Sequence, residues 1–345
     1  INDFIQGIIM LIGIVAVIGA VLASKGGFIA ALNGLAAVTD ESVSAMPGAF
    51  NSFFGPDPLG LLGVVILTSL GTWGLPQMVQ KFYAIKSEDA VKKGMVISVV
   101  FALVVAGGCY FLGGFGRLFS DSIEIAESGI PVGGYDAVIP TMLSGLPDIL
   151  IAIVVILVLS ASMSTLSSLV LASSSTITID FLKDNFIKNM DEKKQVRTMR
   201  VFVVVFVVIS AAIAVFQYQS SMSATSSNSA TFIAQLMGVS WGALAGAFLA
   251  PFLYGLYWKG TTRASCWVSF LFGSVLMIMN MLARPSFPAL LQSPINCGAF
   301  AMLAGLVIVP VVSLFTKKPD AALVDEAFAC YEKKVAVSQK RSLID

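Results

Sequence analysis

The 345-residue chain contains no histidine and few charged residues, which make up 12% of its composition. A typical globular protein has about 25% charged residues. Because 57% of this chain is hydrophobic, the composition predicts an integral membrane protein. The absence of histidine removes the commonest catalytic base and metal ligand. A net charge of +1 argues against a nucleic-acid partner.

The cysteines are few and show no paired spacing. They are Cys109, Cys266, Cys297 and Cys330. Such scattered positions argue against a disulfide framework and against a metal site. No motif pairs a nucleophile with a base, so we expect that the chain is not an enzyme. The chain begins with Ile1-Asn2-Asp3 and then enters an apolar stretch, without an initiator methionine or a signal-type cleavage site, so we expect it to be a fragment, or the ordered part, of something longer.

Long apolar stretches dominate the sequence instead. A helix needs roughly 20 apolar residues to cross a bilayer. Eight stretches meet this requirement, and they lie near residues 4–22, 58–79, 95–115, 147–178, 201–216, 231–256, 264–282 and 297–315. We therefore predict an all-α integral membrane protein in which residues 1–316 form one transmembrane domain. Residues 317–345 are expected to form a short cytoplasmic tail with one helix near 321–334.

The distribution of basic residues predicts the orientation of these spans. Of 21 lysines and arginines, only Lys25, Arg117 and Arg284 lie in the loops that follow odd-numbered spans. Basic residues concentrate on the cytoplasmic side of membrane proteins. The sequence therefore predicts a multi-pass protein of the cell membrane with both termini of this chain in the cytoplasm.

Acidic and basic side chains are missing from the middle of every predicted span. Asp3, Asp148 and Asp180 lie at span ends only. Proton-coupled transporters usually place such groups inside the membrane, so a proton relay is not expected. Coupling to a monovalent cation held by hydroxyl and carbonyl oxygens needs no buried carboxylate and stays open.

A cluster of hydroxyl side chains interrupts the fourth span. One helical face carries only small residues, namely Ala161, Ser164, Thr165, Ser168, Ala172 and Ser175. This face is typical of a tight packing seam between helices, in which hydroxyls bond to nearby carbonyls. It also fits a cation site in which the side chains of Ser164 and Thr165 and the Ala161 carbonyl supply oxygens. The residues alone leave both interpretations open.

The second span contains residues that weaken a helix. Gly71, Gly74 and Pro76 follow an apolar run and are predicted to break or bend it. A broken helix at membrane depth can expose backbone groups to a substrate or an ion, whereas the alternative is a kink stabilised by its neighbours. Thr68 and Thr72 are four residues apart and are expected to face the same way.

Several segments resemble the sodium:solute symporter family. The run Ala161-Ser162-Met163-Ser164-Thr165-Leu166-Ser167-Ser168, with the segment 174–183 after it, is similar to the family's signature helix. The segment 74–84 resembles the exit of the sixth core helix, with Leu75 in place of a polar residue and Lys81 in place of arginine. Residues 2–6 resemble the entry to the fifth core helix. Pro251 and Trp258 match the tenth.

The resemblance implies a partial leucine-transporter-type inverted-repeat fold that covers core helices five to ten plus two more. The family begins with about five further helices, which would precede Ile1. They include the broken first core helix that supplies the remaining sodium ligands. The resemblance further implies that Ala161, Ser164 and Thr165 line a sodium site and that Asp3 lies on the cytoplasmic ion path. On this reading Na⁺ is the coupling ion. Candidates for the substrate side are Thr68, Thr72, Trp73, Ser240 and Trp241.

The function that these residues predict is sodium-coupled symport by alternating access. The solute would be a small organic molecule such as an amino acid, a sugar or a carboxylate, and the lipid bilayer would be the other partner. One alternative is a transporter-like membrane sensor domain, although residues 317–345 contain no signalling module. A passive solute permease is a further alternative, which the near-absence of charge in the spans disfavours.

Overall fold

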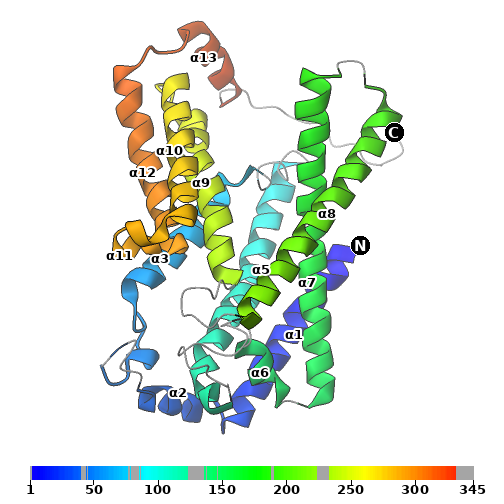
Figure 1. The fold of residues 1–345 in the computed structure, drawn as a ribbon, viewed down its shortest axis with the longest axis vertical. Helices are drawn as coiled ribbons and strands as arrows, with labels where there is room; N and C mark the ends of the chain where they lie inside the picture. The colour runs from blue at the N-terminus through cyan, green and yellow to red at the C-terminus, as the bar shows by residue number, and fades with distance from the viewer. Residues whose placement is uncertain are drawn as a thin grey trace. The chain divides into compact units, whose positions relative to one another are not determined.

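The computed structural model describes residues 2–39, 44, 46–76, 78, 85, 87–122, 136, 138–145, 147–187, 190–223 and 233–331. The regular elements of this part of the chain are helices (Figure 1), which confirms the all-α prediction. The chain divides into two compact units, each built from two segments of sequence. Unit 1 contains residues 1–56 and 95–232, and unit 2 contains residues 57–94 and 233–345.

Unit 1 is built from the following elements: α1 (Asn2–Ser24), α2 (Phe28–Ala37), the 3₁₀ turn η1 (Ala49–Asn51), most of α5 (Glu88–Gly114), η3 (Phe115–Ser122), α6 (Val138–Ser144), α7 (Asp148–Ser175), the π-helix η5 (Thr176–Lys183) and α8 (Glu192–Ser223). Its core joins α1 to α5 and α6 through Ile14, Val17, Leu112 and Met142. The apolar faces of these helices thus pack against one another inside the unit.

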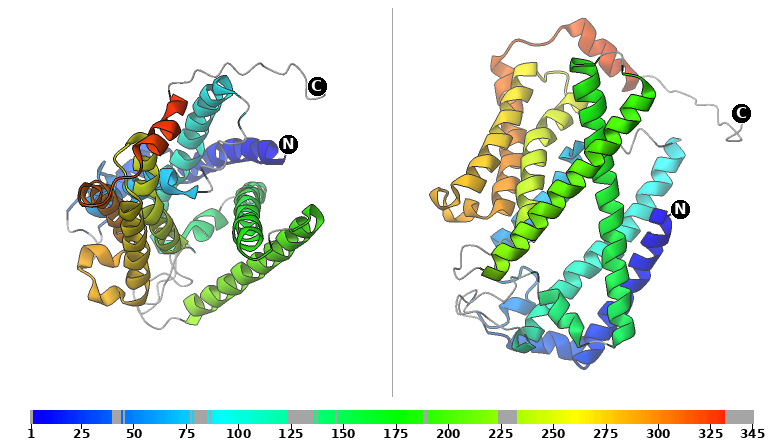
Figure 2. Two further views of the ribbon diagram at one scale, coloured as in Figure 1. Left: turned by 90° about the horizontal axis from the view of Figure 1, so that it is seen from above. Right: turned by 45° about the vertical axis from the view of Figure 1, so that its right-hand side comes forward.

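Unit 2 is built from α3 (Pro58–Ser69), the 3₁₀ turn η2 (Gly71–Gly74), α9 (Ile233–Tyr257), α10 (Arg263–Leu282), η6 (Arg284–Ser286), α11 (Ala289–Gln292), α12 (Pro294–Phe315), α13 (Ala321–Phe328) and η7 (Ala329–Tyr331). The helices α9, α10 and α12 lie side by side as one bundle in both views of Figure 2. A β-carbon at Gly273 of α10 would collide with the carbonyl group of Gly246 of α9. Small residues therefore let these helix backbones touch.

Hydrogen bonds between hydroxyl groups join α10 and α12 at one end of this bundle. Thr262 caps α10 by accepting a hydrogen bond from the Ser265 backbone N–H at 3.2 Å. The Ser313 hydroxyl of α12 donates to the Ser265 hydroxyl at 2.8 Å, and the hydroxyls of Thr262 and Thr316 lie 2.6 Å apart. Thr262, Ser265 and Ser313 are all buried. Because each of these hydroxyls has a partner, the network stabilises the junction of α10 and α12.

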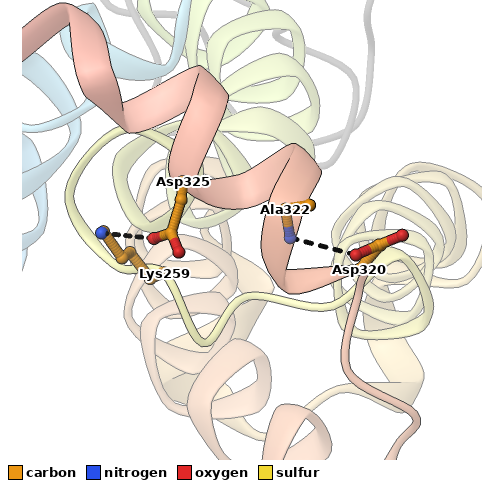
Figure 3. Close-up of polar contacts among 4 residues, drawn as sticks. All are labelled: Lys259, Asp320, Ala322 and Asp325. Carbon is orange, nitrogen blue, oxygen red and sulfur yellow. Dashed lines mark hydrogen bonds and ion pairs between the residues drawn. The ribbon is translucent and has the colours of Figure 1, made fainter.

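The first helix of the tail, α13, is attached to the same end of unit 2. The Lys259 ammonium lies 2.7 Å from the Asp325 carboxylate, and the Asp320 carboxylate accepts a hydrogen bond from the Ala322 N–H at 3.0 Å (Figure 3). The Tyr331 hydroxyl also donates to the Leu256 carbonyl at 3.1 Å. The tail helix expected near residues 321–334 is thus present, and residues 332–345 lie outside the described part of the chain.

Seven helices of the described residues are long and apolar enough to cross a membrane. They include α8, in which no residue of the apolar 18-residue window is buried inside the structure. The stretch predicted as the second span forms the shorter apolar segment Pro58–Gly74, which consists of α3 and the 3₁₀ turn η2. Together these helices make the chain a multi-pass membrane protein. The number of eight spans and the single transmembrane domain over residues 1–316 stay predictions.

Candidate functional site

The predicted cation-binding residues line a hollow inside unit 1. Ala161, Ser164 and Thr165 of α7 form one wall of this hollow, whose volume is about 490 Å³. The opposite walls come from α1 and α5. The α1 wall consists of Phe4, Gly7, Ile8, Met10 and Leu11, and the α5 wall of Ile97 and Phe101. The polar groups on the described walls are therefore those of α7, and the rest of the lining is apolar.

Serine hydroxyls next to this wall form hydrogen bonds with backbone carbonyls of α7 itself. The Ser167 hydroxyl donates to the Ser164 carbonyl at 3.1 Å, and the Ser168 hydroxyl donates to the Thr165 carbonyl at 2.9 Å. These bonds are the local kind that serine makes within a helix. Because Thr165 is exposed and Ser164 and Ala161 are half-buried, this part of the face borders open space. Both the packing seam and the cation site stay predictions for this face.

The helix remains regular along the wall. α7 is α-helical from Asp148 to Ser175, and its departure from α geometry comes only at Thr176, where the π-helix η5 begins. The Ala161 carbonyl is therefore inside regular helix. A carbonyl oxygen has two lone pairs, so one can accept the helix hydrogen bond while the other faces an ion. π-helical turns often occur near functional sites.

The ion-path candidate Asp3 lies in the first turn of α1. Its side chain lies outside the described residues, as do residues 77 and 79–84 of the motif that resembles the exit of the sixth core helix. The expectation for Asp3 therefore stays a prediction.

The predicted break in the second span is confirmed. α3 ends at Ser69, a 3₁₀ turn follows at Gly71–Gly74, and Leu75 is extended. A β-carbon at Gly74 would lie 3.0 Å from the Cα atoms of Ala245 and Leu249 of α9. The broken segment thus packs directly against α9, and only glycine fits at this contact.

The substrate-side candidates all belong to unit 2, and their polar groups have local partners. The Thr68 hydroxyl donates to the Val64 carbonyl at 2.8 Å, and the Thr72 hydroxyl donates to the Ser69 carbonyl at 3.1 Å. The Ser240 hydroxyl makes a longer bond of 3.4 Å within α9. These three hydroxyls are bonded to their own helices in the conformation described.

The two tryptophans of this group differ in their surroundings. Trp73 is 59% exposed, so its ring is free to contact a ligand or lipid. Trp241 packs against a buried cluster of Leu67, Ala245 and Met302. The structure therefore gives Trp241 a packing role, and a contact with solute would be additional.

Two buried polar residues were not among the predicted site residues. Gln6 of α1 and Thr178 of η5 each have a buried side-chain oxygen without a hydrogen-bond partner in the described part of the chain. The sequence signal for Gln6 is its place as the only polar residue from Phe4 to Ala23. The signal for Thr178 is its place at the end of the hydroxyl-rich face.

Comparisons with known proteins agree with the resemblance of the sequence motifs. The chain is 29% identical to the sodium/proline symporter of Staphylococcus aureus over 331 residues, which cover 93% of this chain and 59% of that relative. The sodium/proline symporters of S. aureus strains JH9 and Newman are 29% identical over 333 residues, with the same coverage. These names describe transporters rather than enzymes. The chain spans 59% of the length of these relatives.

The family model gives the assignment directly. The model of the sodium:solute symporter family matches residues 1–273, which is well over half of the chain. The matched range contains α1, the broken segment α3–η2, the hydroxyl face of α7, and α9. We conclude that this chain belongs to the sodium:solute symporter family.

Proposed function

We propose that this chain forms part of a sodium-coupled symporter that moves a small organic solute across the cell membrane by alternating access. The observation that carries the proposal is the wall of Ala161, Ser164 and Thr165, which brings two hydroxyl-bearing residues to a hollow otherwise lined by apolar residues. Sodium is a hard cation and binds oxygen ligands. Family membership and the names of the relatives support the same function.

Sodium binding drives transport only if its affinity differs between the conformations of the protein. A ligand shifts a conformational equilibrium by the difference between its affinities for the two states. In the proposal, sodium at the α7 wall favours the outward-open state, and Asp3 lies on the route by which the ion leaves to the cytoplasm.

Proline is the first solute to test, because the matched relatives are sodium/proline symporters. On the substrate side we propose Thr68, Thr72, Trp73, Ser240 and Trp241. For Thr68, Thr72 and Ser240, donation to a solute requires the hydroxyl to turn from its present carbonyl acceptor, whereas its oxygen can accept from a solute without turning. Exchange of one hydrogen bond for another keeps the cost of this rotation small.

The test is uptake of labelled proline by cells that produce the complete natural protein. With sodium replaced by choline, uptake is expected to fall to the background of cells without the protein. Uptake that is unchanged in choline would refute sodium coupling and would favour a passive permease. Absence of proline uptake in sodium would instead refute only the choice of solute, and other amino acids, sugars and carboxylates would be screened in the same way.

The site is tested with paired substitutions on α7. The variants Ser164→Ala and Thr165→Ala remove one oxygen each and are expected to raise the sodium concentration for half-maximal uptake. Ser162→Ala is the matched control, because Ser162 is an exposed serine on the same helix but not part of the hollow's wall. An unaltered sodium dependence in both hydroxyl variants would show that the site is elsewhere.

The proposed orientation is tested at Cys330, which is exposed in η7 near the C-terminal end of the described chain. In a variant that keeps Cys330 and replaces the other three cysteines of this sequence by alanine, a membrane-impermeant maleimide should label inside-out vesicles. Labelling of right-side-out vesicles would place this end outside the cell and would contradict the orientation. The same variant with Cys330→Ala gives the background.

A further inference from the structure

A basic hollow lies at one end of unit 2, between the turn that joins α9 to α10 and the tail helix α13. Its volume is about 270 Å³. The charged residues that line its described walls are Lys259 and Arg263, which are both positive and both exposed. Thr261 and Thr262 line it next to them. Because these charges have one sign, the hollow favours a negatively charged ligand.

The tail helix supplies an apolar wall to this hollow. The α13 residues that line it share a hydrocarbon side chain, and they are Leu323, Val324, Ala327 and Phe328. The neighbouring Asp325 is not among them, although its carboxylate lies 2.7 Å from the Lys259 ammonium (Figure 3). An ammonium group has three N–H donors, so Lys259 can bind an anion while it keeps Asp325. The carboxylate lowers the net positive charge beside the hollow.

A second hollow, of apolar character, adjoins the first at Trp258, which lines both. Its volume is about 460 Å³. The other residues on its described walls are aromatic or aliphatic, and they are Leu253, Tyr254, Tyr257 and Pro310. The Tyr254 hydroxyl donates to the Leu306 carbonyl at 2.9 Å, so its polar group already has a partner. This hollow therefore offers hydrocarbon surface to a ligand.

The wall that the two hollows share is held in place by its neighbours. The ring of Trp258 lies edge-on to the ring of Tyr254, with 5.7 Å between the centroids. A β-carbon at Gly260 would lie 2.6 Å from the Trp258 ring, so glycine lets the chain turn close beside the indole. The Thr261 hydroxyl donates to the carbonyls of Tyr254 and Trp258 at 2.9 and 3.0 Å. A ligand that binds here pays little to order this wall.

The two hollows differ in their depth along the membrane helices. The candidate span of α9 ends at Tyr257 and that of α10 begins at Arg263, so the basic hollow lies where both spans reach the membrane surface. The apolar hollow extends along α9 to Leu253, roughly 6 Å further into the span. Tryptophan and tyrosine favour this interfacial level. Positive charge at the surface with hydrocarbon below it fits an amphiphile that has an anionic headgroup and an acyl chain.

We propose that this end of unit 2 binds an anionic phospholipid. Its phosphate lies in the basic hollow beside Lys259 and Arg263, and an acyl chain packs in the apolar hollow against Trp258. Basic pockets on the cytoplasmic side of membrane helices bind the headgroups of anionic lipids. The choice of the cytoplasmic leaflet rests on the proposed orientation. The lipid site itself involves unit 2 alone and does not require sodium coupling.

The test measures binding of radiolabelled dioleoyl phosphatidylglycerol to the complete natural protein, purified in detergent, by scintillation proximity. The double variant Lys259→Gln/Arg263→Gln removes both charges from exposed positions, so we expect it to fold. The half-saturating lipid concentration should rise about 25-fold, because each basic residue near an anionic lipid contributes about fivefold. Wild-type protein without saturable binding, or a double variant with wild-type affinity, would overturn the proposal.

The matched control is Lys317→Gln/Lys318→Gln. It removes the same charge from the same end of unit 2, directly after α12, but neither lysine lines the hollow. Both lysines are exposed. The half-saturating concentration should change by about twofold or less, since salt screens exposed charges at a distance from the ligand. An equal loss of affinity in the two double variants would show general attraction to a basic surface and would refute a built site.

The variant Asp325→Asn tests the sign of the ligand's charge. It removes the negative charge beside Lys259 and should tighten phosphatidylglycerol binding, by up to about fivefold. A wall of α13 that serves only to hold the helix in place predicts no such gain. Weaker binding in this variant would contradict an anion in the basic hollow.

Unlabelled competitors distinguish a lipid from a free anion. Dioleoyl phosphatidylcholine has the same chains but no net charge, and it should need at least about fivefold more than phosphatidylglycerol to displace the label. Inorganic phosphate has charge but no chain, and at equal concentration it should displace none. Equal competition by phosphatidylcholine would refute recognition of charge, and equal competition by phosphate would refute a lipid site. Because this assay contains no transport step, its outcome is independent of sodium-dependent uptake.

Discussion

The contact between α9 and α10 gives a sharp prediction for the variant Gly273→Ala. A β-carbon at residue 273 would overlap the carbonyl carbon and oxygen of Gly246 and lie 2.8 Å from the backbone nitrogen of Ala247. All three atoms belong to the backbone, so no side-chain rotation relieves the overlap, and the two helices must separate. Overpacking of this kind typically costs about 1–3 kcal/mol of stability.

The assay is thermal unfolding of the purified protein in detergent, followed by the loss of the monodisperse peak in size-exclusion chromatography. Gly19→Ala is the matched control, since a β-carbon at Gly19 of α1 would meet nothing within 4 Å. Alanine there should be neutral or stabilising by up to about 1 kcal/mol, because it favours helix more than glycine does. Equal melting temperatures for the two variants would refute the close approach of α9 and α10.

Two further predictions concern polar groups of unit 2. Asp325→Asn should change stability by less than about 1 kcal/mol, because Lys259 and Asp325 are 56% and 69% exposed and surface ion pairs contribute little; a loss in the same thermal assay as large as that of Gly273→Ala would contradict this. Ser265→Ala should cost about 1–2 kcal/mol, since it removes the hydroxyl that accepts from the Thr262 backbone N–H in the capping box and from the buried Ser313 hydroxyl. Ser269→Ala should be neutral or stabilising, because the buried Ser269 hydroxyl has no partner in the described chain; the reverse order of the two melting temperatures would refute the network.

The apolar pattern predicted the positions of the membrane helices but not their full lengths. The expected span at 264–282 is the helix Arg263–Leu282, because Thr262 ends the preceding loop with a cap. The expected spans at 95–115 and 201–216 are longer at one or both ends, as Glu88–Gly114 and Glu192–Ser223. Hydropathy detects only the part of a helix that fits the bilayer, whereas charged residues such as Lys92 and Lys193 continue it beyond the apolar stretch.

The local breaks were predictable where a residue's own chemistry causes them. Gly71, Gly74 and Pro76 predicted the end of α3, and it ends at Ser69. The π-helix at Thr176–Lys183 was not predicted, because no residue type in this segment marks π geometry as glycine and proline mark the end of a helix. Sequence patterns thus predict a break only where a residue has a distinctive backbone preference.

The candidate site also has features that the sequence predicts and features that it does not. The period of the helix predicted that Ala161, Ser164 and Thr165 share a face, and all three line one hollow. Gln6 appeared in the sequence only as part of a motif, because neither its burial nor its missing partner is visible without the facing helix. Helical periodicity therefore predicts which residues of one helix share a face, but not which residues of a facing helix are buried against it.

The proposed sodium ligands and the proposed solute contacts lie in different units, and the coupling between sodium binding and solute binding can be measured. The proposed ion ligands belong to unit 1, and the proposed solute contacts belong to unit 2. In the proposed function, sodium and solute influence each other through a coupling free energy, and such coupling is reciprocal for binding. If saturating sodium raises the affinity for the solute by a given factor, saturating solute must raise the affinity for sodium by the same factor. Binding isotherms of both ligands to the purified protein measure the two factors. For variants on the α7 wall, both affinity factors should fall by the same amount. A solute affinity that is independent of sodium would mean that the hollow in unit 1 does not serve transport.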